Sequence, residues 1–167
     1  IFCGSGMTSA VNKLQRILGM RIPEHILDYA EREGLENVNG LTVHSINIKS
    51  IFDKYLKLDE VLLPVVFVTH MEHHSNHTSW LETIATVEII KPDEKGNIDL
   101  KHFRSLLEQY KLNTNKIAAI TGCSNVTGIQ TPCHEIAKLI HKYGGLCFVD
   151  FACSAPYIDI NMHPEEQ

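Results

Sequence analysis

The chain has 167 residues, of which 44% are hydrophobic and 21% are charged, a composition typical of a globular domain with a substantial core. The net charge of -5, without a basic stripe, argues against nucleic acid as the main partner. No apolar run approaches the roughly 20 residues that span a bilayer, and the chain does not open on a signal peptide. Five cysteines without a repeated spacing favour free thiols in a reducing compartment, so we expect a cytoplasmic protein.

Short apolar runs alternate along the chain with amphipathic windows at helical spacing. Proline and aspartate at helix starts and β-branched residues in the short runs set the expected boundaries. In chain order we expect a helix over 8–18, a helix from Pro23, a helix over 46–56, strands over 65–68 and 87–90, a helix capped by Asp99, a strand over 117–120, a helix opened by Thr131 and Pro132 that runs to Tyr143, and a strand over 147–149.

Strands that alternate with helices indicate an α/β fold with a mostly parallel sheet covered on both faces, that is, three α/β/α layers. The carboxyl ends of parallel strands meet at one edge of such a sheet, where ligands bind. The residues that directly follow each predicted strand are therefore the candidates for chemistry.

Cys147-Phe148-Val149-Asp150 is an apolar run that ends on a carboxylate. Because no polar residue interrupts the run, it predicts a short buried parallel strand with Asp150 at its carboxyl end. Burying an unpaired charge is costly, so this carboxylate needs a partner, such as a protonated pyridine nitrogen. The alternative is that Asp150 caps a turn or the next helix.

Gly4-Ser5-Gly6-Met7-Thr8-Ser9 is a turn of small residues before the first helix. The free N–H groups of a helix start, with the hydroxyls of Thr8 and Ser9, suit a phosphate. Simple helix capping explains the same residues. The turn is neither a Walker loop nor a dinucleotide fingerprint, because the required glycine and lysine spacing is missing.

Four histidines lie between His70 and His77, directly after the strand over 65–68. One interpretation is a metal site, in which His73 and His77 share a helix face. Another is an imidazole laid over a flat cofactor that also moves protons. A solvated patch at a helix start is the third. We expect no metal, because no cysteine or carboxylate pair completes a recognisable ligand set.

Thr121-Gly122-Cys123-Ser124-Asn125 follows the strand over 117–120. The Asn125 side chain is able to donate a hydrogen bond to a phenolate-like oxygen. Asparagine in a loop with glycine is also a common turn residue.

Four short motifs follow one another along the chain: Gly-Met-Thr-Ser, Glu-His-His-Ser-Asn, Ser-Asn-Val-Thr-Gly and Val-Asp-Phe-Ala. In this order they resemble the class V aminotransferase family, which includes the cysteine desulfurases and selenocysteine lyases. The strongest segment runs from Met71 to Trp80. The resemblance implies the type I fold of enzymes that use pyridoxal 5'-phosphate.

The resemblance also implies roles for individual residues. Thr8 and the amides around Met7 hold the cofactor phosphate, and His73 stacks on the pyridine ring and moves protons. Asn125 contacts the phenolic oxygen of the ring. Asp150 pairs with the pyridinium nitrogen and keeps it protonated.

Three features depart from the family pattern. Cys153 stands where the family usually has a glutamine that bonds the phenolic oxygen, and thiols are weak donors. A spectator role for Cys153 is the alternative, because it has no basic neighbour in sequence. Thr8-Ser9 replaces the usual Thr-Glu, and the segment 20–63 is longer than the usual connection.

The family's Schiff-base lysine lies in a Ser-x-His-Lys motif downstream of the aspartate strand, and no lysine of this chain sits in such a motif. We therefore expect residues 1–167 to be a single-domain fragment of the large cofactor-binding domain, without the lysine and the small domain.

For the full-length parent we expect a homodimeric pyridoxal-phosphate enzyme with an amino-acid substrate. A cysteine desulfurase-like carbon–sulfur lyase is the leading reaction, and a class V aminotransferase of other specificity is the alternative. A histidine-cluster metalloenzyme and a non-catalytic interaction domain are competitors from other classes.

Overall fold

The fold is seen in a computed structural model that describes residues 4–23 and 63–162. Its centre is a sheet in the order β2-β1-β3-β4, and every neighbouring pair of strands is parallel. The strands are β1 (Val65–Thr69), β2 (Thr86–Ile90), β3 (Lys116–Thr121) and β4 (Leu146–Asp150). The predicted parallel sheet is confirmed, and each predicted strand is present within one or two residues of its expected bounds.

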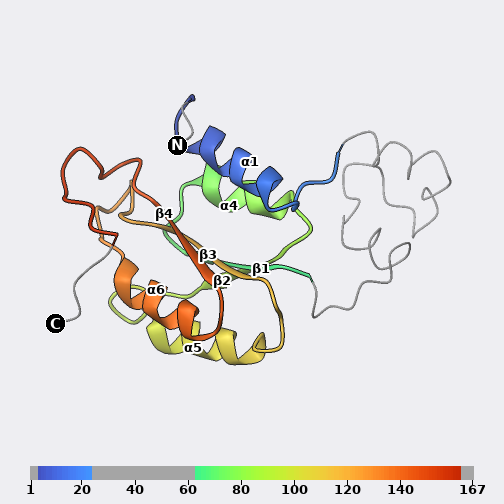
Figure 1. The fold of residues 1–167 in the computed structure, drawn as a ribbon. Helices are drawn as coiled ribbons and strands as arrows, with labels where there is room; N and C mark the ends of the chain where they lie inside the picture. Colours follow the sequence, from blue (N-terminus) through green and yellow to red (C-terminus); the bar gives the residue numbers. More distant parts are fainter. Residues whose placement is uncertain (1–3, 24–62, 163–167) are drawn as a thin grey trace, which may run out of the picture.

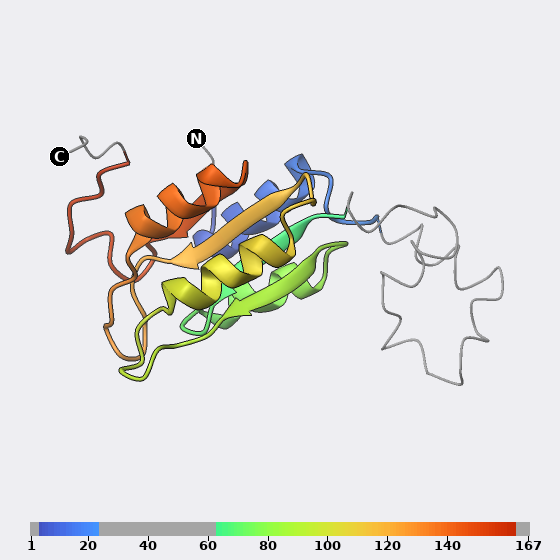
Figure 2. The same cartoon turned by 90° about the horizontal axis from the view of Figure 1, so that it is seen from below.

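Helices cover both faces of the sheet (Figures 1 and 2). On one face lie α1 (Met7–Ile17) and α4 (His74–Leu81), and on the other lie α5 (Leu100–Gln109) and α6 (Cys133–Lys142). The three-layer α/β/α architecture is therefore confirmed. The helices predicted from Pro23 and over 46–56, and most of the segment 20–63, lie outside the described residues.

The central strands are apolar without a break because both of their faces are covered. Along β1, Phe67 points toward α5 and packs edge-on against Phe103, with ring centroids 5.4 Å apart. Its neighbour Val66 points the other way and packs with Trp80 of α4. The alternation divides the core into two apolar clusters, one on each side of the sheet.

The helix starts follow the predicted signals closely. Asp99 caps α5, since its Oδ1 accepts hydrogen bonds from the N–H groups of Lys101 (2.8 Å) and His102 (3.0 Å). The helix α6 begins at Cys133, one residue later than predicted. Pro132 is its N-cap residue and has a ψ of 70°, outside the helical region.

The prediction that the strand before Asp150 is buried is wrong. Leu146 is 51% exposed, and the residues from Cys147 to Asp150 are only half-buried. The reason is the strand order: within the described residues β4 pairs with β3 alone and forms an edge of the sheet. An apolar run fits an edge strand with one half-covered face as well as it fits a central strand.

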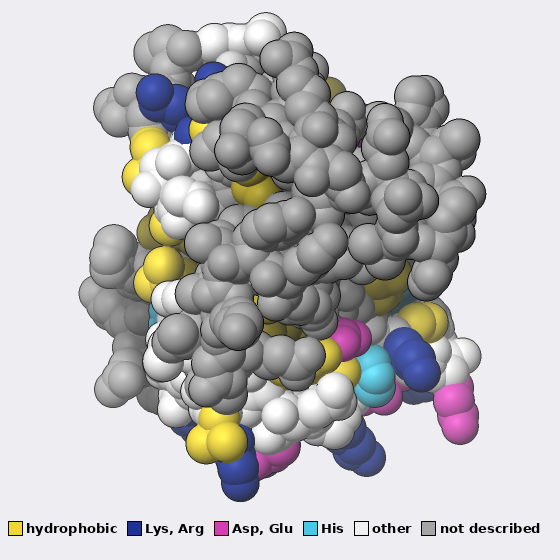
Figure 3. Space-filling model, turned by 90° about the vertical axis from the view of Figure 1, so that its right-hand side faces the viewer, with side chains coloured by type: hydrophobic (Ala, Val, Ile, Leu, Met, Phe, Trp, Pro, Cys, Tyr) yellow, Lys and Arg dark blue, Asp and Glu magenta, His cyan; other side chains and the backbone are white. Residues whose placement is uncertain are grey.

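In the described ranges 4–23 and 63–162 no helix has the length and apolar character needed to cross a membrane. On the face shown in Figure 3, acidic, basic and apolar side chains lie interspersed over the described part of the surface.

The burial of Ile136 in α6 and the exposure of Ile17 in α1 predict that the same substitution changes the free energy of unfolding by different amounts at the two positions. Ile136 is fully buried against the sheet, whereas Ile17 at the end of α1 is 59% exposed. We expect Ile136→Val to lower the free energy of unfolding by about 1 kcal/mol through the lost methylene and the remaining cavity. Ile17→Val is the matched control and should stay within about 0.5 kcal/mol. Urea unfolding followed by the fluorescence of Trp80 measures both, and equal effects would contradict the packing described.

Candidate functional site

The carboxyl ends of β1, β3 and β4 meet at one edge of the sheet, and α1 begins at the same edge (Figure 1). The parallel register pairs Thr121 at the end of β3 with Asp150 at the end of β4. The segments that follow these three strands carry His73, Asn125 and Cys153. Parallel pairing therefore brings the candidate residues to one edge, although they are far apart in sequence.

Asp150 ends β4 with a half-buried carboxylate. Its Oδ1 accepts a hydrogen bond from the N–H of Ala152 (2.8 Å). One of the two carboxylate oxygens of Asp150 thus caps the turn that follows β4, as the alternative interpretation expected. No other hydrogen bond or ion pair holds this carboxylate within the described part of the chain, so the second oxygen is available to a ligand.

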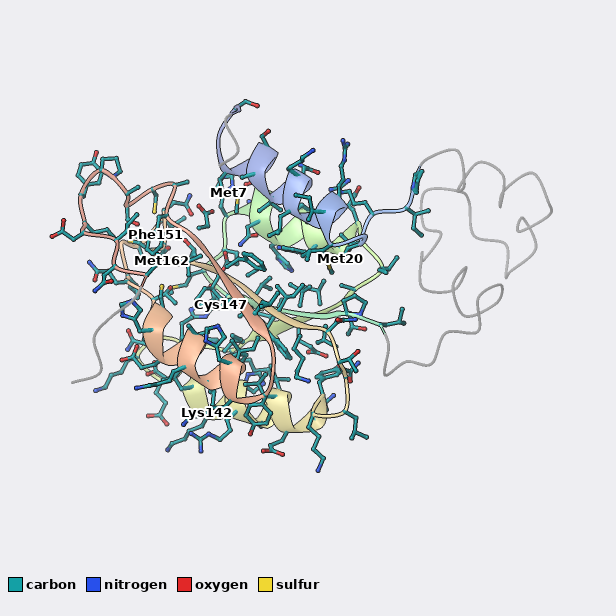
Figure 4. The ribbon with its side chains drawn as sticks, in the orientation of Figure 1. Met7, Met20, Lys142, Cys147, Phe151 and Met162 are labelled. Atoms are coloured by element: carbon teal, nitrogen blue, oxygen red, sulfur yellow. The ribbon has the colours of Figure 1, made fainter. Side chains whose placement is uncertain are left out.

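A cavity of about 360 Å³ opens between α1, α4 and β4, within the size range of ligand pockets. Its lining is mostly apolar, and the polar side chains in it are those of Asn76 and Asp150. Met7 at the start of α1 and Met162 near the end of the described chain border it on the side nearest the carboxyl edge (Figure 4). Met7 and Asp150 thus line the same cavity, whereas Thr8, His73, Asn125 and Cys153 do not line it.

Thr8 faces a different space from Met7. It lines an open groove along the outer side of α1 together with polar and basic residues, namely Ser5, Ser9, Asn12, Lys13 and Arg16. The N-cap residue of α1 is Gly6, and no side chain among the described residues caps this helix start. The first N–H groups of α1 therefore keep their donor capacity, and the capping alternative for Thr8 does not hold here.

His73 is the N-cap residue of α4 and has extended backbone angles. Its Nδ1 accepts a hydrogen bond from the N–H of Ser75 (3.2 Å) and lies 2.7 Å from the Ser75 hydroxyl. His73 therefore directly precedes the helix that carries His77, and its carbonyl accepts a hydrogen bond from the N–H of His77 (3.1 Å). Among the described residues no three His, Cys, Asp or Glu side chains come together to hold a metal ion.

Asn125 and Cys153 lie in the loops that follow β3 and β4, and both are exposed. The Cys153 thiol donates to the carbonyl oxygen of Cys123 (3.0 Å) and so links the two loops. Partial burial and the neighbouring Cys123 raise the pKa of Cys153, which favours the thiol over the reactive thiolate. The same two loops also pack together at Gly122. The ring of Phe151 lies so close to the backbone there that a Cβ at position 122 would be 2.6 Å from it, so only glycine leaves room for the ring.

Sequence reasoning assigned no role to two polar residues of the strongest motif, Glu72 and Asn76. Glu72 Oε1 accepts from the Thr69 hydroxyl (2.6 Å) and the N–H of Thr121 (2.8 Å). Glu72 Oε2 accepts from Asn76 Nδ2 (2.7 Å), and Asn76 Oδ1 accepts from the indole N–H of Trp80 (3.0 Å). Asn76 and Trp80 lie four residues apart on one face of α4, and this spacing was the signal in the sequence. Glu72 precedes the helix, and its bonds to Thr69 and Thr121 follow from the sheet.

Burial raises the pKa of the Glu72 carboxyl above its ordinary value of 4.5. Hydrogen bonds from Thr69, Asn76 and Thr121 act in the opposite direction, and the cost of desolvation is the larger effect. Glu72 is thus an acid held among donors at the junction of β1, β3 and α4.

A three-layer parallel domain with its polar side chains at the carboxyl edge of the sheet is the architecture of a ligand-binding α/β enzyme domain. The model of the family "Aminotransferase class-V" matches residues 37–165, which is most of the chain, and the chain belongs to this family. The family implies pyridoxal phosphate as cofactor. The match includes His73, Asn125, Asp150 and Cys153 and begins after Met7 and Thr8.

Curated relatives agree with the family. A probable cysteine desulfurase of Synechocystis sp. is 30% identical over 155 residues, which are 90% of this chain and 33% of that protein. A probable cysteine desulfurase of Chlamydia muridarum is 36% identical over 91 residues, which are 52% of this chain and 22% of that protein. The chain thus spans a third or less of the length of these relatives.

Solved structures show the same fold. A NifS-like protein from Rickettsia africae superimposes with a TM-score of 0.53 at 27% identity, covering 59% of this chain and 27% of that one. The apo cysteine desulfurase of Thermococcus onnurineus has a TM-score of 0.51 at 27% identity, covering 60% of this chain and 25% of that one.

The raised pKa of Glu72 predicts a specific pH dependence of stability. Between its ordinary value of 4.5 and the raised pKa, the folded chain holds a proton that the unfolded chain has lost. The contribution of Glu72 to stability is therefore full below pH 4.5 and falls as the pH rises through the raised pKa. Urea midpoints measured from pH 4 to 8 should lose this component in Glu72→Gln. The exposed Glu82→Gln is the control, and an unchanged pH profile in Glu72→Gln would contradict the assignment.

Proposed function

We propose that the full-length protein is a pyridoxal-phosphate enzyme acting on an amino acid, and that this chain supplies part of its cofactor site. The similarity to a probable cysteine desulfurase over 90% of the chain supports a carbon–sulfur lyase acting on cysteine. The observation that carries the proposal is Asp150 at the carboxyl end of β4, bordering a cavity within a chain of this family.

The donors and acceptors of the site fit the proposed cofactor. When bound, pyridoxal phosphate supplies a ring that accepts electrons from the substrate. The available oxygen of Asp150 would accept a hydrogen bond from the N–H of the protonated ring and so keep the ring protonated, since an ion pair in a partly dry site favours both charged forms. Asp150 Oδ1 stays fixed by the N–H of Ala152, so the carboxylate is oriented before the ligand arrives.

The start of α1 suits the phosphate group. Its first N–H groups have no side-chain cap, and the positive end of the helix dipole favours an anion there. In this proposal the N–H groups near Met7 and the hydroxyl of Thr8 bind the phosphate oxygens.

His73 acts through its second ring nitrogen. A backbone N–H only donates, so the bond from Ser75 N–H makes Nδ1 of His73 the acceptor. In the neutral imidazole the proton then sits on Nε2. We propose that Nε2 exchanges protons with the substrate while the ring face covers the cofactor.

Asn125 supplies an amide donor for the phenolic oxygen in this proposal. Cys153 takes the place of the usual glutamine, but its thiol is bonded to the Cys123 carbonyl. We therefore propose that Cys153 holds the loop after β4 against the loop after β3 and contributes little to the electronics of the ring.

Three further expectations stay predictions: the single domain over 1–167, the homodimer and the cytoplasmic location. The four cysteines among the described residues are free, which fits a reducing compartment. The size of the full-length protein in solution, measured by light scattering, tests the homodimer.

The proposed function predicts a yellow, cysteine-consuming protein. Full-length protein reconstituted with pyridoxal phosphate should show a visible cofactor band that borohydride abolishes. With cysteine and a thiol reductant it should form alanine and sulfide in equal amounts. Formation of a keto acid instead of sulfide would favour an aminotransferase. A protein that binds zinc and no pyridoxal phosphate would contradict the proposal.

The proposed roles predict that two side chains matter far more than their exposed counterparts. In the full-length enzyme Asp150→Asn should lower kcat by about 10²-fold or more while most of the cofactor stays bound, because the charge opposite the ring nitrogen is lost. His73→Ala should lower kcat by about 10²- to 10⁴-fold through the lost proton transfer. Asp159→Asn and His141→Ala are matched exposed controls. Wild-type rates in Asp150→Asn and His73→Ala would refute the roles.

A further inference from the structure

Glu72 directly precedes His73 and lies where β1, β3 and α4 meet. We propose that Glu72 is the positioning residue of the site: its partly buried carboxylate holds the first turn of α4 and thereby places His73 at the carboxyl edge of the sheet. This inference rests on the proposed function, because it concerns the histidine that covers the cofactor.

One oxygen of the carboxylate joins two strand ends. Glu72 Oε1 accepts from the hydroxyl of Thr69 (2.6 Å) and from the N–H of the same residue (3.2 Å), at the end of β1. It also accepts from the N–H of Thr121 (2.8 Å), at the end of β3. Three donors at one oxygen fix its place, and all three belong to the rigid sheet.

The other oxygen holds the helix. Glu72 Oε2 accepts from Asn76 Nδ2 (2.7 Å), and the same nitrogen donates to the Ala119 carbonyl (3.3 Å) in the middle of β3. The Asn76 amide has one orientation only, because its Oδ1 must accept from the indole N–H of Trp80 (3.0 Å). Asn76 and Trp80 are buried almost completely, so each of these bonds is costly to leave unmade.

The helix start in turn holds His73. The His73 carbonyl accepts from the N–H groups of Asn76 (2.9 Å) and His77 (3.1 Å). The His73 ring itself is exposed, and its contacts among the described residues are with Ser75 and with the ring of His74. The position of the ring therefore follows from the backbone, and the backbone is anchored through Asn76 to Glu72.

Glu72→Gln is a selective probe of this anchor. The glutamine oxygen still serves Thr69 and Thr121, but its NH₂ group then faces the NH₂ group of Asn76. Turning the Asn76 amide around does not repair the contact, because its NH₂ would then face the indole N–H of Trp80 and its oxygen would face the Ala119 carbonyl. The substitution thus removes the bond from residue 72 to the helix, and it leaves the bonds of residue 72 to the two strand ends and the bond from Asn76 to the Ala119 carbonyl.

Glu72→Gln combined with Asn76→Asp restores a donor opposite an acceptor. The glutamine NH₂ donates to the new carboxylate, whose other oxygen still accepts from Trp80. One negative charge stays in the network, and only the contact with the Ala119 carbonyl becomes unfavourable. This double variant should therefore recover part of what the single variant loses.

The test uses the full-length protein with and without pyridoxal phosphate, and compares wild type, Glu72→Gln, the double variant and the exposed control Glu82→Gln. We expect Glu72→Gln to lower kcat about 10- to 100-fold, as small displacements of catalytic groups do, with the KM for cysteine unchanged. The induced circular dichroism of the bound cofactor should weaken. In the cofactor-free protein, hydrogen exchange of the N–H groups of residues 73–77 should be faster. The double variant should regain part of each property, and the control should match wild type.

Two outcomes separate this inference from the proposed function. A wild type without cofactor band or turnover refutes the proposed function, and hydrogen exchange in the cofactor-free protein still decides whether Glu72 holds the helix start. An active wild type with unchanged kcat, dichroism and hydrogen exchange in Glu72→Gln overturns the positioning role. Should Glu72→Gln fail to fold, a folded double variant with wild-type-like dichroism supports the role, and one without it overturns the role.

Discussion

Parallel pairing of β1, β3 and β4 is the constraint on which the rest of this structure depends. In a parallel sheet all strands end at the same edge, and the register Thr121–Asp150 and Phe67–Ala118 sets how far each strand reaches. The loops after β1, β3 and β4 and the start of α1 therefore share one rim. Met7 and Asp150, which are more than a hundred positions apart in sequence, therefore line the same cavity.

Two carboxylates at this rim have opposite environments. Glu72 is enclosed and accepts hydrogen bonds from Thr69, Asn76 and Thr121, so both of its oxygens are committed to holding the protein together. Asp150 is half-exposed at the end of β4, and within residues 4–23 and 63–162 its carboxylate accepts one hydrogen bond, from the N–H of Ala152. Both oxygens of Glu72 are occupied by hydrogen bonds within the protein, which suits a structural role. Asp150 has an oxygen that is able to accept a hydrogen bond from a ligand.

The sequence predicted the elements well where local signals were strong. The β-branched run of β1, the Asp99 cap of α5 and the glycines after α6 each depend on near neighbours in the chain, and each feature is present. The burial of β4 was predicted wrongly. An apolar run indicates that a strand packs against other elements, but the number of neighbouring strands that cover it depends on the strand order. The separation of Met7 from Thr8 also depends on how α1 lies on the sheet, since adjacent helical residues point about 100° apart.

By itself, the order of motifs determined the family, the parallel α/β class and the residues that follow each strand, because these are written in short local patterns. Only the tertiary structure decided that β4 pairs with β3 alone among the described residues, that His73 Nδ1 accepts from the N–H of Ser75, and that Glu72 bonds to Asn76 of α4. The physical reason is the same in each case. Hydrogen-bond partners such as Glu72 and Thr121, 49 positions apart, are chosen by packing, and no local pattern of residues contains that choice.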